Sequence, residues 1–392
     1  MMSKWGKQRL TGIVLLATML LGIIIAGTGC VSGLSPIGWS GGAVDDDTLY
    51  IGSKEGRLVA VNLTDESRLW SDPLKTTTSA GLFGCSPGAM AGGCGSGPSG
   101  VAIYGTPVVY NDLVYIAGYN GKIYAYTAGS LAVRWVYPRE GNLEPFVGGM
   151  AADDGRLFIG SSDGIIYAFD AATGDKLWEV QTGEEDKKPD KIWSTPVVDG
   201  DTVYVASFDK KLYALDVADG SSRWEFEAAG SLIAMPLVED GTVYIGSFDK
   251  YMYAIDATDG SLKWKFLAEN WFWARPVLYG GNLYAGCLDK KVYVLAAASG
   301  NKMAEYDLGS PVSSMPVVVG GSVIFASRDG IVYDLDTGTG ELKELMDVEE
   351  DVYGPLTAYG DIVHVHTQDL TLHRVNVDNG AILRSISLER PD

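Results

Sequence analysis

The sequence predicts an all-β fold assembled from eight four-stranded antiparallel units. Three observations carry this prediction: a repeat along the chain, tight-turn residues at fixed places within it, and strands that are apolar on both faces. Residues 194–224 recur almost letter for letter at residues 234–264. Tyr204 in the second apolar run has a counterpart in each of the other units: Tyr50, Tyr115, Phe158, Tyr244, Tyr284, Ile324 and His364.

Each unit contains four short runs separated by turns. In the unit of Tyr204, Pro196 opens the first run, an Asp-Gly turn leads to the second, and Phe-Asp-Lys forms the turn to the third. A second Asp-Gly turn precedes the fourth run, which contains Trp224. Four strands joined by such turns form an antiparallel meander of about 40 residues, the size of one propeller blade.

The spacing of the units is regular in the second half of the chain. From Tyr204 onward the interval is 40 residues; before it the intervals are 65, 43 and 46 residues, so the extra residues precede blades 2, 3 and 4. Because the runs are apolar on both faces, the blades must stack face to face, and a closed ring leaves no apolar face exposed. We therefore expect a single eight-bladed β-propeller domain over residues 31–392, with a Gly-rich insertion at about residues 71–103.

A motif of the form Ala-x-Asp-x-x-x-Gly-x-x-x-Trp occurs at residues 168–178, 214–224 and 254–264, with degenerate forms at 60–70 and 125–135. It resembles the tryptophan-docking repeat of the quinoprotein-like (PQQ-like) eight-bladed propellers, and residues 36 to 388 look like the BamB-like lipoprotein branch of that family. The resemblance implies that five tryptophans dock between blades: Trp70, Trp135, Trp178, Trp224 and Trp264. Truncating such a ring to Ala costs about 3–5 kcal/mol when it is fully buried.

The first thirty residues have the pattern of a signal peptide with a lipobox-like end. Lys4, Lys7 and Arg9 precede an uncharged, largely apolar stretch that ends in Ala-Gly-Thr-Gly-Cys at Cys30. We predict that Cys30 is lipidated after cleavage, which would tether an exported protein to the outer side of the cytoplasmic membrane or within the cell envelope. Gly27 departs from the usual lipobox, so an uncleaved membrane helix is the alternative.

Composition excludes some partners. Without the first thirty residues the chain has 27 basic and 50 acidic residues, a net charge of −23. Such a surface repels nucleic acid, so we predict no nucleic-acid partner. The acidic runs at 184–186 and 349–351 fall between blades and are either solvated loops or a docking surface for a basic partner.

The cysteines and histidines of the chain are candidates for different roles. Cys85 and Cys94 lie in the Gly-rich insertion and are candidates for a disulfide, whereas Cys287 is expected to be a buried small hydrophobe. The quinone enzymes of the family use two adjacent cysteines, which this chain lacks, so we predict no quinone cofactor and no dehydrogenase activity. The histidines of the chain, His364, His366 and His373, either pack between blades or, if His373 pairs opposite His366, form a zinc site.

A further candidate site is a ring of aromatic residues. Three residues before the residue that opens each first strand lie Trp39, Tyr104, Val147, Trp193, Ile233, Trp273, Ser313 and Val352. First strands line the central channel of a propeller, so we expect Trp39, Tyr104, Trp193 and Trp273 to gather at one mouth, with Arg275 as a lone cation and Trp271 nearby. This mouth either binds a peptide or small ligand, or its rings simply cap the channel.

These features predict a non-enzymatic propeller scaffold that binds extracytoplasmic or envelope proteins or peptides. The resemblance to the BamB-like branch implies a role in envelope protein assembly. Two alternatives remain: a PQQ- or metal-dependent enzyme, and an extracytoplasmic ligand-sensing module.

Overall fold

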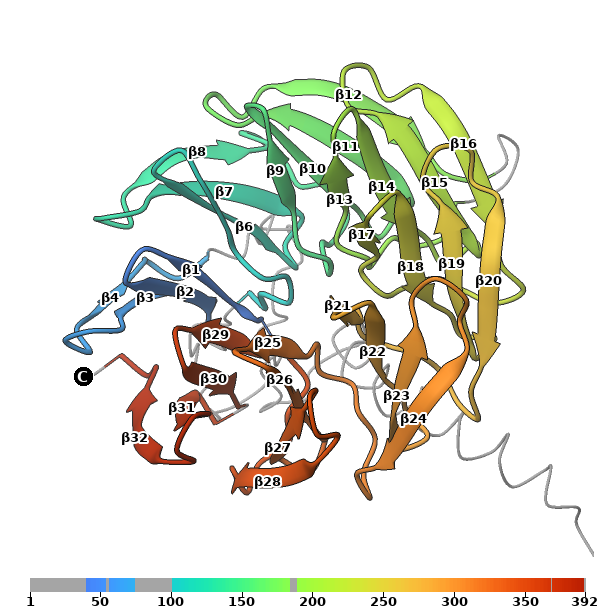
Figure 1. The fold of residues 1–392 in the computed structure, drawn as a ribbon. Coiled ribbons are helices and arrows are strands. Elements are labelled where there is room, and N and C mark those ends of the chain that lie inside the picture. Colours follow the sequence, from blue (N-terminus) through green and yellow to red (C-terminus); the bar gives the residue numbers. More distant parts are fainter. Residues whose placement is uncertain (1–39, 54–55, 75–100, 184–188, 368, 391–392) are drawn as a thin grey trace, which may run out of the picture.

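The computed structural model describes residues 40–53, 56–74, 101–183, 189–367 and 369–390. These residues form eight four-stranded antiparallel sheets arranged as the blades of one β-propeller, as Figure 1 shows. The prediction of an all-β, eight-bladed propeller is therefore confirmed. In the described part of the chain, no helix is both long and apolar enough to cross a membrane.

The strands follow the chain in order. Blade 1 contains β1 (Gly42–Asp45), β2 (Thr48–Gly52), β3 (Leu58–Asn62) and β4 (Arg68–Trp70). Blade 2 contains β5 (Val108–Tyr110), β6 (Leu113–Gly118), β7 (Lys122–Thr127) and β8 (Val133–Tyr137). Blade 3 contains β9 (Ala151–Asp153), β10 (Arg156–Gly160), β11 (Ile165–Asp170) and β12 (Lys176–Gln181). Blade 4 contains β13 (Val197–Asp199), β14 (Thr202–Ala206), β15 (Lys211–Asp216) and β16 (Ser222–Glu227).

The second half repeats this plan. Blade 5 contains β17 (Leu237–Glu239), β18 (Thr242–Gly246), β19 (Tyr251–Asp256) and β20 (Leu262–Leu267). Blade 6 contains β21 (Val277–Tyr279), β22 (Asn282–Gly286), β23 (Lys291–Ala296) and β24 (Lys302–Asp307). Blade 7 contains β25 (Val317–Val319), β26 (Ser322–Ala326), β27 (Ile331–Asp336) and β28 (Leu342–Asp347). Blade 8 contains β29 (Thr357–Tyr359), β30 (Ile362–His366), β31 (Thr371–Asn376) and β32 (Ile382–Ser387).

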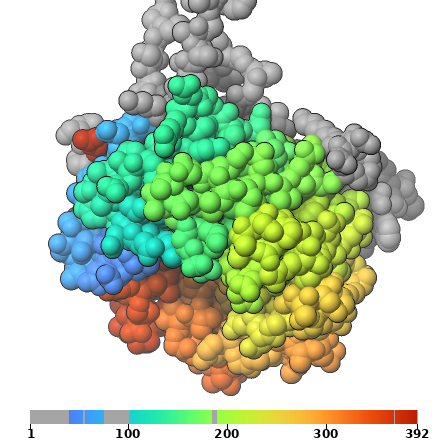
Figure 2. All heavy atoms as spheres, turned by 90° about the horizontal axis from the view of Figure 1, so that it is seen from above, coloured from blue at the N-terminus to red at the C-terminus, as the bar shows by residue number. Residues whose placement is uncertain are grey.

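The ring closes by contact between blades 8 and 1, with no strand shared between them among the described residues. The inner strand β1 lies beside both β5 and β29. Leu49 and Ile51 of blade 1 pack in one core cluster with Leu372 and Ile386 of blade 8. Figure 2 accordingly shows the blue surface of blade 1 directly beside the red surface of blade 8. Closure therefore rests on side-chain packing and on a few polar contacts across this seam.

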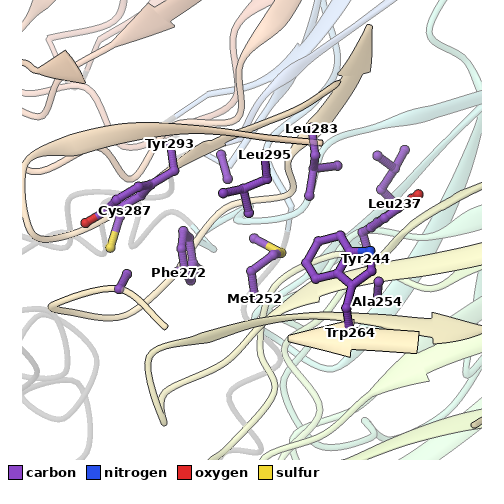
Figure 3. Packing of buried hydrophobic residues seen from close by; sticks show 12 residues of the cluster. Leu237, Tyr244, Met252, Ala254, Trp264, Phe272, Leu283, Cys287, Tyr293 and Leu295 are labelled. Atoms are coloured by element: carbon purple, nitrogen blue, oxygen red, sulfur yellow. The ribbon is translucent and has the colours of Figure 1, made fainter. Parts of the chain in front are cut away.

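The core consists of apolar layers between neighbouring blades. Between blades 5 and 6, for example, Tyr244, Met252 and Trp264 face Leu283 and Leu295 (Figure 3). Met252, Leu283 and Leu295 are fully buried. Because both faces of the second and third strands are covered in this way, these strands read as continuous apolar runs, whereas the outer strands alternate between partly buried and exposed residues.

Four tryptophans dock on the following blade with one geometry. A β-bulge places Trp224 opposite Ala214, and its indole Nε1 donates to the Ala257 carbonyl oxygen of blade 5 at 3.0 Å. The ring lies against Gly260, where a Cβ atom would come within 2.7 Å of it. The motif thus joins two interfaces, since its Gly receives the tryptophan of the preceding blade. The matching bonds to backbone oxygens are Trp135 to Ala171 (3.0 Å), Trp178 to Val217 (3.1 Å) and Trp264 to Ala297 (2.7 Å).

Trp70 docks in the opposite direction. Blade 1 lacks the bulge, so Leu69 pairs with Ala60 and Trp70 pairs with Val59. A shift of one residue moves a side chain to the other face of the sheet. Trp70 therefore faces blade 8, and its Nε1 donates to the Leu388 carbonyl oxygen at 3.1 Å. The residue stabilises the closing seam rather than the interface with blade 2.

Candidate binding surface at the channel mouth

The structure confirms only part of the predicted ring of exposed aromatic residues, because Tyr104 is buried whereas Trp193 and Trp273 are partly exposed. Trp39 lies outside the described residues, as do Cys30, Cys85 and Cys94. Tyr104 is buried, with 5% of its surface exposed, and meets Tyr119 edge-on at 5.6 Å between ring centroids. Its pKa is raised to about 12, chiefly by burial. At the same position Val147 and Ile233 are also buried. The packing alternative thus describes Tyr104 well.

Trp193 and Trp273 are partly exposed and belong to a continuous aromatic ladder across blades 4 to 6. Its five members are Trp193, Phe208, Phe248, Trp271 and Trp273. Trp193 meets Phe208 edge-on at 4.8 Å, and Phe208 meets Phe248 edge-on at 6.3 Å. Phe248 stacks on Trp271 at 4.5 Å and on Trp273 at 5.8 Å. Every member retains exposed surface, so the aromatic ladder combines fixed geometry with access for a partner.

Polar groups accompany the aromatic ladder. The exposed Lys191 ammonium lies 5.3 Å from the centroid of the Trp193 ring. The indole Nε1 of Trp193 is buried and has no hydrogen-bond partner among the described residues. A buried donor without a partner is costly, because it has lost its bonds to water and gained none.

Arg275 is the most strongly desolvated cation of this surface. Burial lowers the pKa of its guanidinium, and the charge of Glu239 opposes that shift. Its Nε is buried without a hydrogen-bond partner among the described residues. The position just before the first-strand proline carries Thr195 in blade 4 and Met235 in blade 5, so the repeat does not require a charge here. An anionic group would find a cation whose interaction is little screened by water.

Three aromatic residues are not among the predicted site residues. Phe208 and Phe248 lie in the turns that follow the second strands of blades 4 and 5, where the repeat pattern predicts only a turn. Tyr353, not Val352, occupies the ring position in blade 8, because Thr357 pairs with His364 as Val197 pairs with Tyr204. An alignment on the small residue Gly354, which corresponds to Ser194, identifies Tyr353 as the ring residue. Pro355 corresponds to Thr195 and not to Pro196, so an alignment on the prolines is shifted by one residue.

The zinc alternative rested on a wrong pairing. His373 pairs with Val365, while His366 pairs with Leu372. His373 therefore projects from the opposite face to His364 and His366. Across the described residues, no three His, Cys, Asp or Glu side chains are placed to hold a metal ion.

The residues also do not fit the quinone of the family's enzymes. Cys287, the one cysteine that the structure describes, is fully buried between blades, and its Sγ lies 3.3 Å from the carbonyl oxygens of Asn270 and Trp271. No adjacent cysteines exist in the sequence to stack on a quinone.

The known proteins similar to this chain include assembly factors and dehydrogenases. Over 141 residues it is 27% identical to the outer membrane protein assembly factor BamB of Alkalilimnicola ehrlichii, covering 36% of this chain and 32% of that protein. Over 101 residues it is 33% identical to the 1-butanol dehydrogenase (cytochrome c) of Thauera butanivorans, covering 24% and 15%. The matches thus span less than two thirds of these relatives.

A solved structure and a family model cover more of the chain. The crystal structure of BamB from Moraxella catarrhalis aligns with a TM-score of 0.59 and 25% identity, covering 72% of this chain and 84% of that one. The family model described as outer membrane protein assembly factor BamB matches residues 37–180 and 162–386. Together with the eight docked blades, these matches show that the chain belongs to the BamB-like family of PQQ-like propeller proteins.

Proposed function

We propose that this protein is an exported lipoprotein, tethered through Cys30, that acts as a non-catalytic scaffold in the assembly of envelope proteins. The observation that carries the proposal is the aromatic ladder. Five partly exposed rings held in mutual contact form a rigid, amphipathic surface of the kind that anchors protein interfaces. Membership of the BamB-like family supports the role in assembly, and the lipobox-like end at Cys30 supports the tether.

The experiment is affinity capture of envelope proteins from solubilised membranes by the full-length protein. Trp193→Ala combined with Trp273→Ala is expected to abolish most of the capture while leaving the melting temperature within a few degrees. Trp224→Ala is the matched control, since its ring docks between blades and its loss should lower stability without changing capture. Equal capture by wild type and the double variant would refute the proposed surface. Cys30→Ser should abolish lipid labelling; continued labelling would show that the anchor lies elsewhere.

A second candidate function is the binding of a small anionic ligand, which the desolvated guanidinium of Arg275 favours. Titration with small carboxylates would then change the tryptophan fluorescence of the wild type, and Arg275→Met would remove the response. A response that survives Arg275→Met would eliminate this site. Methionine is chosen because the equivalent position in the neighbouring blade 5 is Met235.

A further inference from the structure

Three consecutive blades carry a lysine where the backbone favours glycine. The turn between the second and third strands has a residue with positive φ in every blade. Blades 1, 2, 3 and 7 have glycine there: Gly56, Gly121, Gly164 and Gly330. Blades 4, 5 and 6 have lysine: Lys210 (φ 77°), Lys250 (φ 77°) and Lys290 (φ 79°). A side chain in this left-handed region destabilises the turn relative to glycine.

Packing accounts for the glycines and for the residue in blade 8, but not for the lysines. A Cβ on Gly121 would lie 1.8 Å from the Leu143 carbonyl oxygen, and one on Gly330 would lie 2.6 Å from that of Glu350, so no side chain fits. Leu370 of blade 8 also has positive φ, and it is buried in the closing seam. Lys210, Lys250 and Lys290 are instead exposed, and the described residues include no ion pair with any of them.

In these turns the aspartates form hydrogen bonds within the protein, whereas the lysines are exposed to solvent. Asp249 is used internally: its Oδ2 accepts from the Tyr253 hydroxyl at 2.7 Å and from the amides of Ala229 and Gly230 at 3.0 and 3.2 Å. Asp209 accepts from the Tyr213 hydroxyl and Asp289 from the Tyr293 hydroxyl in the same way. The carboxylates thus hold the turns together, and the lysines are left as the outward charge.

The lysines border the aromatic ladder. Lys210 and Lys250 each follow a ladder residue, Phe208 and Phe248, by two positions in the same turn. The neighbouring Lys291 is already neutralised by Glu269 and Glu305 at 3.5 and 3.4 Å. Strain at one turn position, repeated in three blades without a packing reason, points to a role for these side chains in contacts outside the fold.

We propose that Lys210, Lys250 and Lys290 form with the aromatic ladder a docking surface for an extended, acidic segment of a partner protein. Carboxylates of the segment pair with the three lysines, and apolar or aromatic side chains between them pack on the aromatic ladder. Lys210, Lys250 and Lys290 are exposed cations beside the aromatic ladder in a chain of net charge −20, so an acidic segment finds pairing partners here that most of the remaining surface lacks. This inference rests on the proposed function, since it assumes a protein partner and uses the same aromatic ladder.

The test is fluorescence anisotropy with the detergent-solubilised full chain and two labelled synthetic peptides, one of alternating Glu and Tyr and one of alternating Lys and Tyr. The Glu peptide is expected to bind at least about tenfold more tightly than the Lys peptide, with an affinity that falls as salt increases. Lys210→Glu with Lys250→Glu and Lys290→Glu should abolish this binding. Lys176→Glu with Lys302→Glu and Lys343→Glu changes the net charge equally on outer strands and should not.

A second triple variant separates the side chains from the backbone. Replacing Lys210, Lys250 and Lys290 by Gly keeps the turns, should raise the melting temperature, and should weaken binding of the Glu peptide by about tenfold or more. Undiminished binding by either triple variant, or an equal loss in the outer-strand control, would overturn the proposal. If the lysine variants lose peptide binding but still capture envelope proteins, the scaffold function stands and does not depend on the lysines. If peptide binding holds but no envelope protein is captured, the function fails and the surface stands.

Discussion

Acidification should loosen the seam between blades 8 and 1, and His364 provides the measurable part of that effect. His364 is 2% exposed, and burial is the main cause that lowers its pKa to about 4. The Arg374 charge on the adjacent strand lowers the pKa further, and a bond to the Thr357 backbone opposes the shift. Arg374 is itself paired across the seam with Glu66 of blade 1. Protonation would place a second positive charge in this desolvated site.

The direction and size of the effect follow from linkage. The unfolded imidazole, with a pKa of 6.5, binds a proton before the folded one does, so stability is complete above about pH 6.5 and is lost as the pH falls toward 4. The pKa difference corresponds to about 3 kcal/mol in full, of which about 2 kcal/mol is lost between about pH 7 and pH 5. The pKa values of His366 and His373 are also lowered by burial, so they act in the same direction.

The assay is urea unfolding at both pH values for the wild type and for His364→Tyr. Tyrosine is the residue at this position in blades 4, 5 and 6, so the variant restores the repeat and removes the titration. The wild type should lose about 2 kcal/mol more than the variant on acidification. His364→Phe removes the titration without a hydroxyl and guards against a poorly folded Tyr variant. An identical pH dependence in wild type and both variants would refute the reasoning, because it would place the proton uptake elsewhere.

Three other predictions concern the blade interfaces and turns. Trp264→Ala should lower the free energy of unfolding by about 3 kcal/mol, because its ring is 9% exposed and its Nε1 bond to Ala297 is lost; a loss below about 1 kcal/mol in urea unfolding would contradict the docking role. Gly260→Ala should lower the melting temperature more than Gly241→Ala. Both glycines have positive φ (75° and 65°), but only at Gly260 would the new Cβ contact a ring, that of Trp224 at 2.7 Å. Equal melting temperatures of the two variants would rule out the clash. Each of Lys210→Gly, Lys250→Gly and Lys290→Gly should stabilise the protein by about 1 kcal/mol through relief of backbone strain, and calorimetry showing a loss would mean that the lysines have stabilising contacts.

The fold was predictable because the physics of each blade repeats with the sequence. Tight turns and two-sided apolar runs recur in all eight units, every 40 residues from Tyr204 onward, and they predict both the strands and the need to close a ring. The errors arose where a one-residue shift decides the outcome. The repeat was aligned one residue out of step in blade 8, which selected Val352 in place of Tyr353, and the register of the same blade separated His373 from His366. Period-two side-chain alternation turns such a shift into a reversal of faces.

The candidate site was harder to predict because its members come from two different turns. Trp193 and Trp273 stood out as bulky residues at a fixed repeat position, but Phe208 and Phe248 were part of the repeat itself. Only the contacts between blades join them into one surface. The sequence also does not predict which side chains are exposed, since Tyr104 and Trp193 occupy equivalent positions in the repeat and only Tyr104 is buried.

Departures from the repeat that carry an energetic cost separate folding roles from binding roles. His364 replaces the repeat's Tyr and is buried in the closing seam, so its effect is confined to the stability of the ring. Arg275 and the three strained lysines gain no comparable packing or pairing from the described residues. Glycine would relieve the backbone strain at the three lysines, and a neutral side chain would remove the unpaired buried Nε of Arg275, so neither feature is explained by the stability of the fold. Contact with an external partner would account for the three lysines and for Arg275, all of which accompany the aromatic ladder.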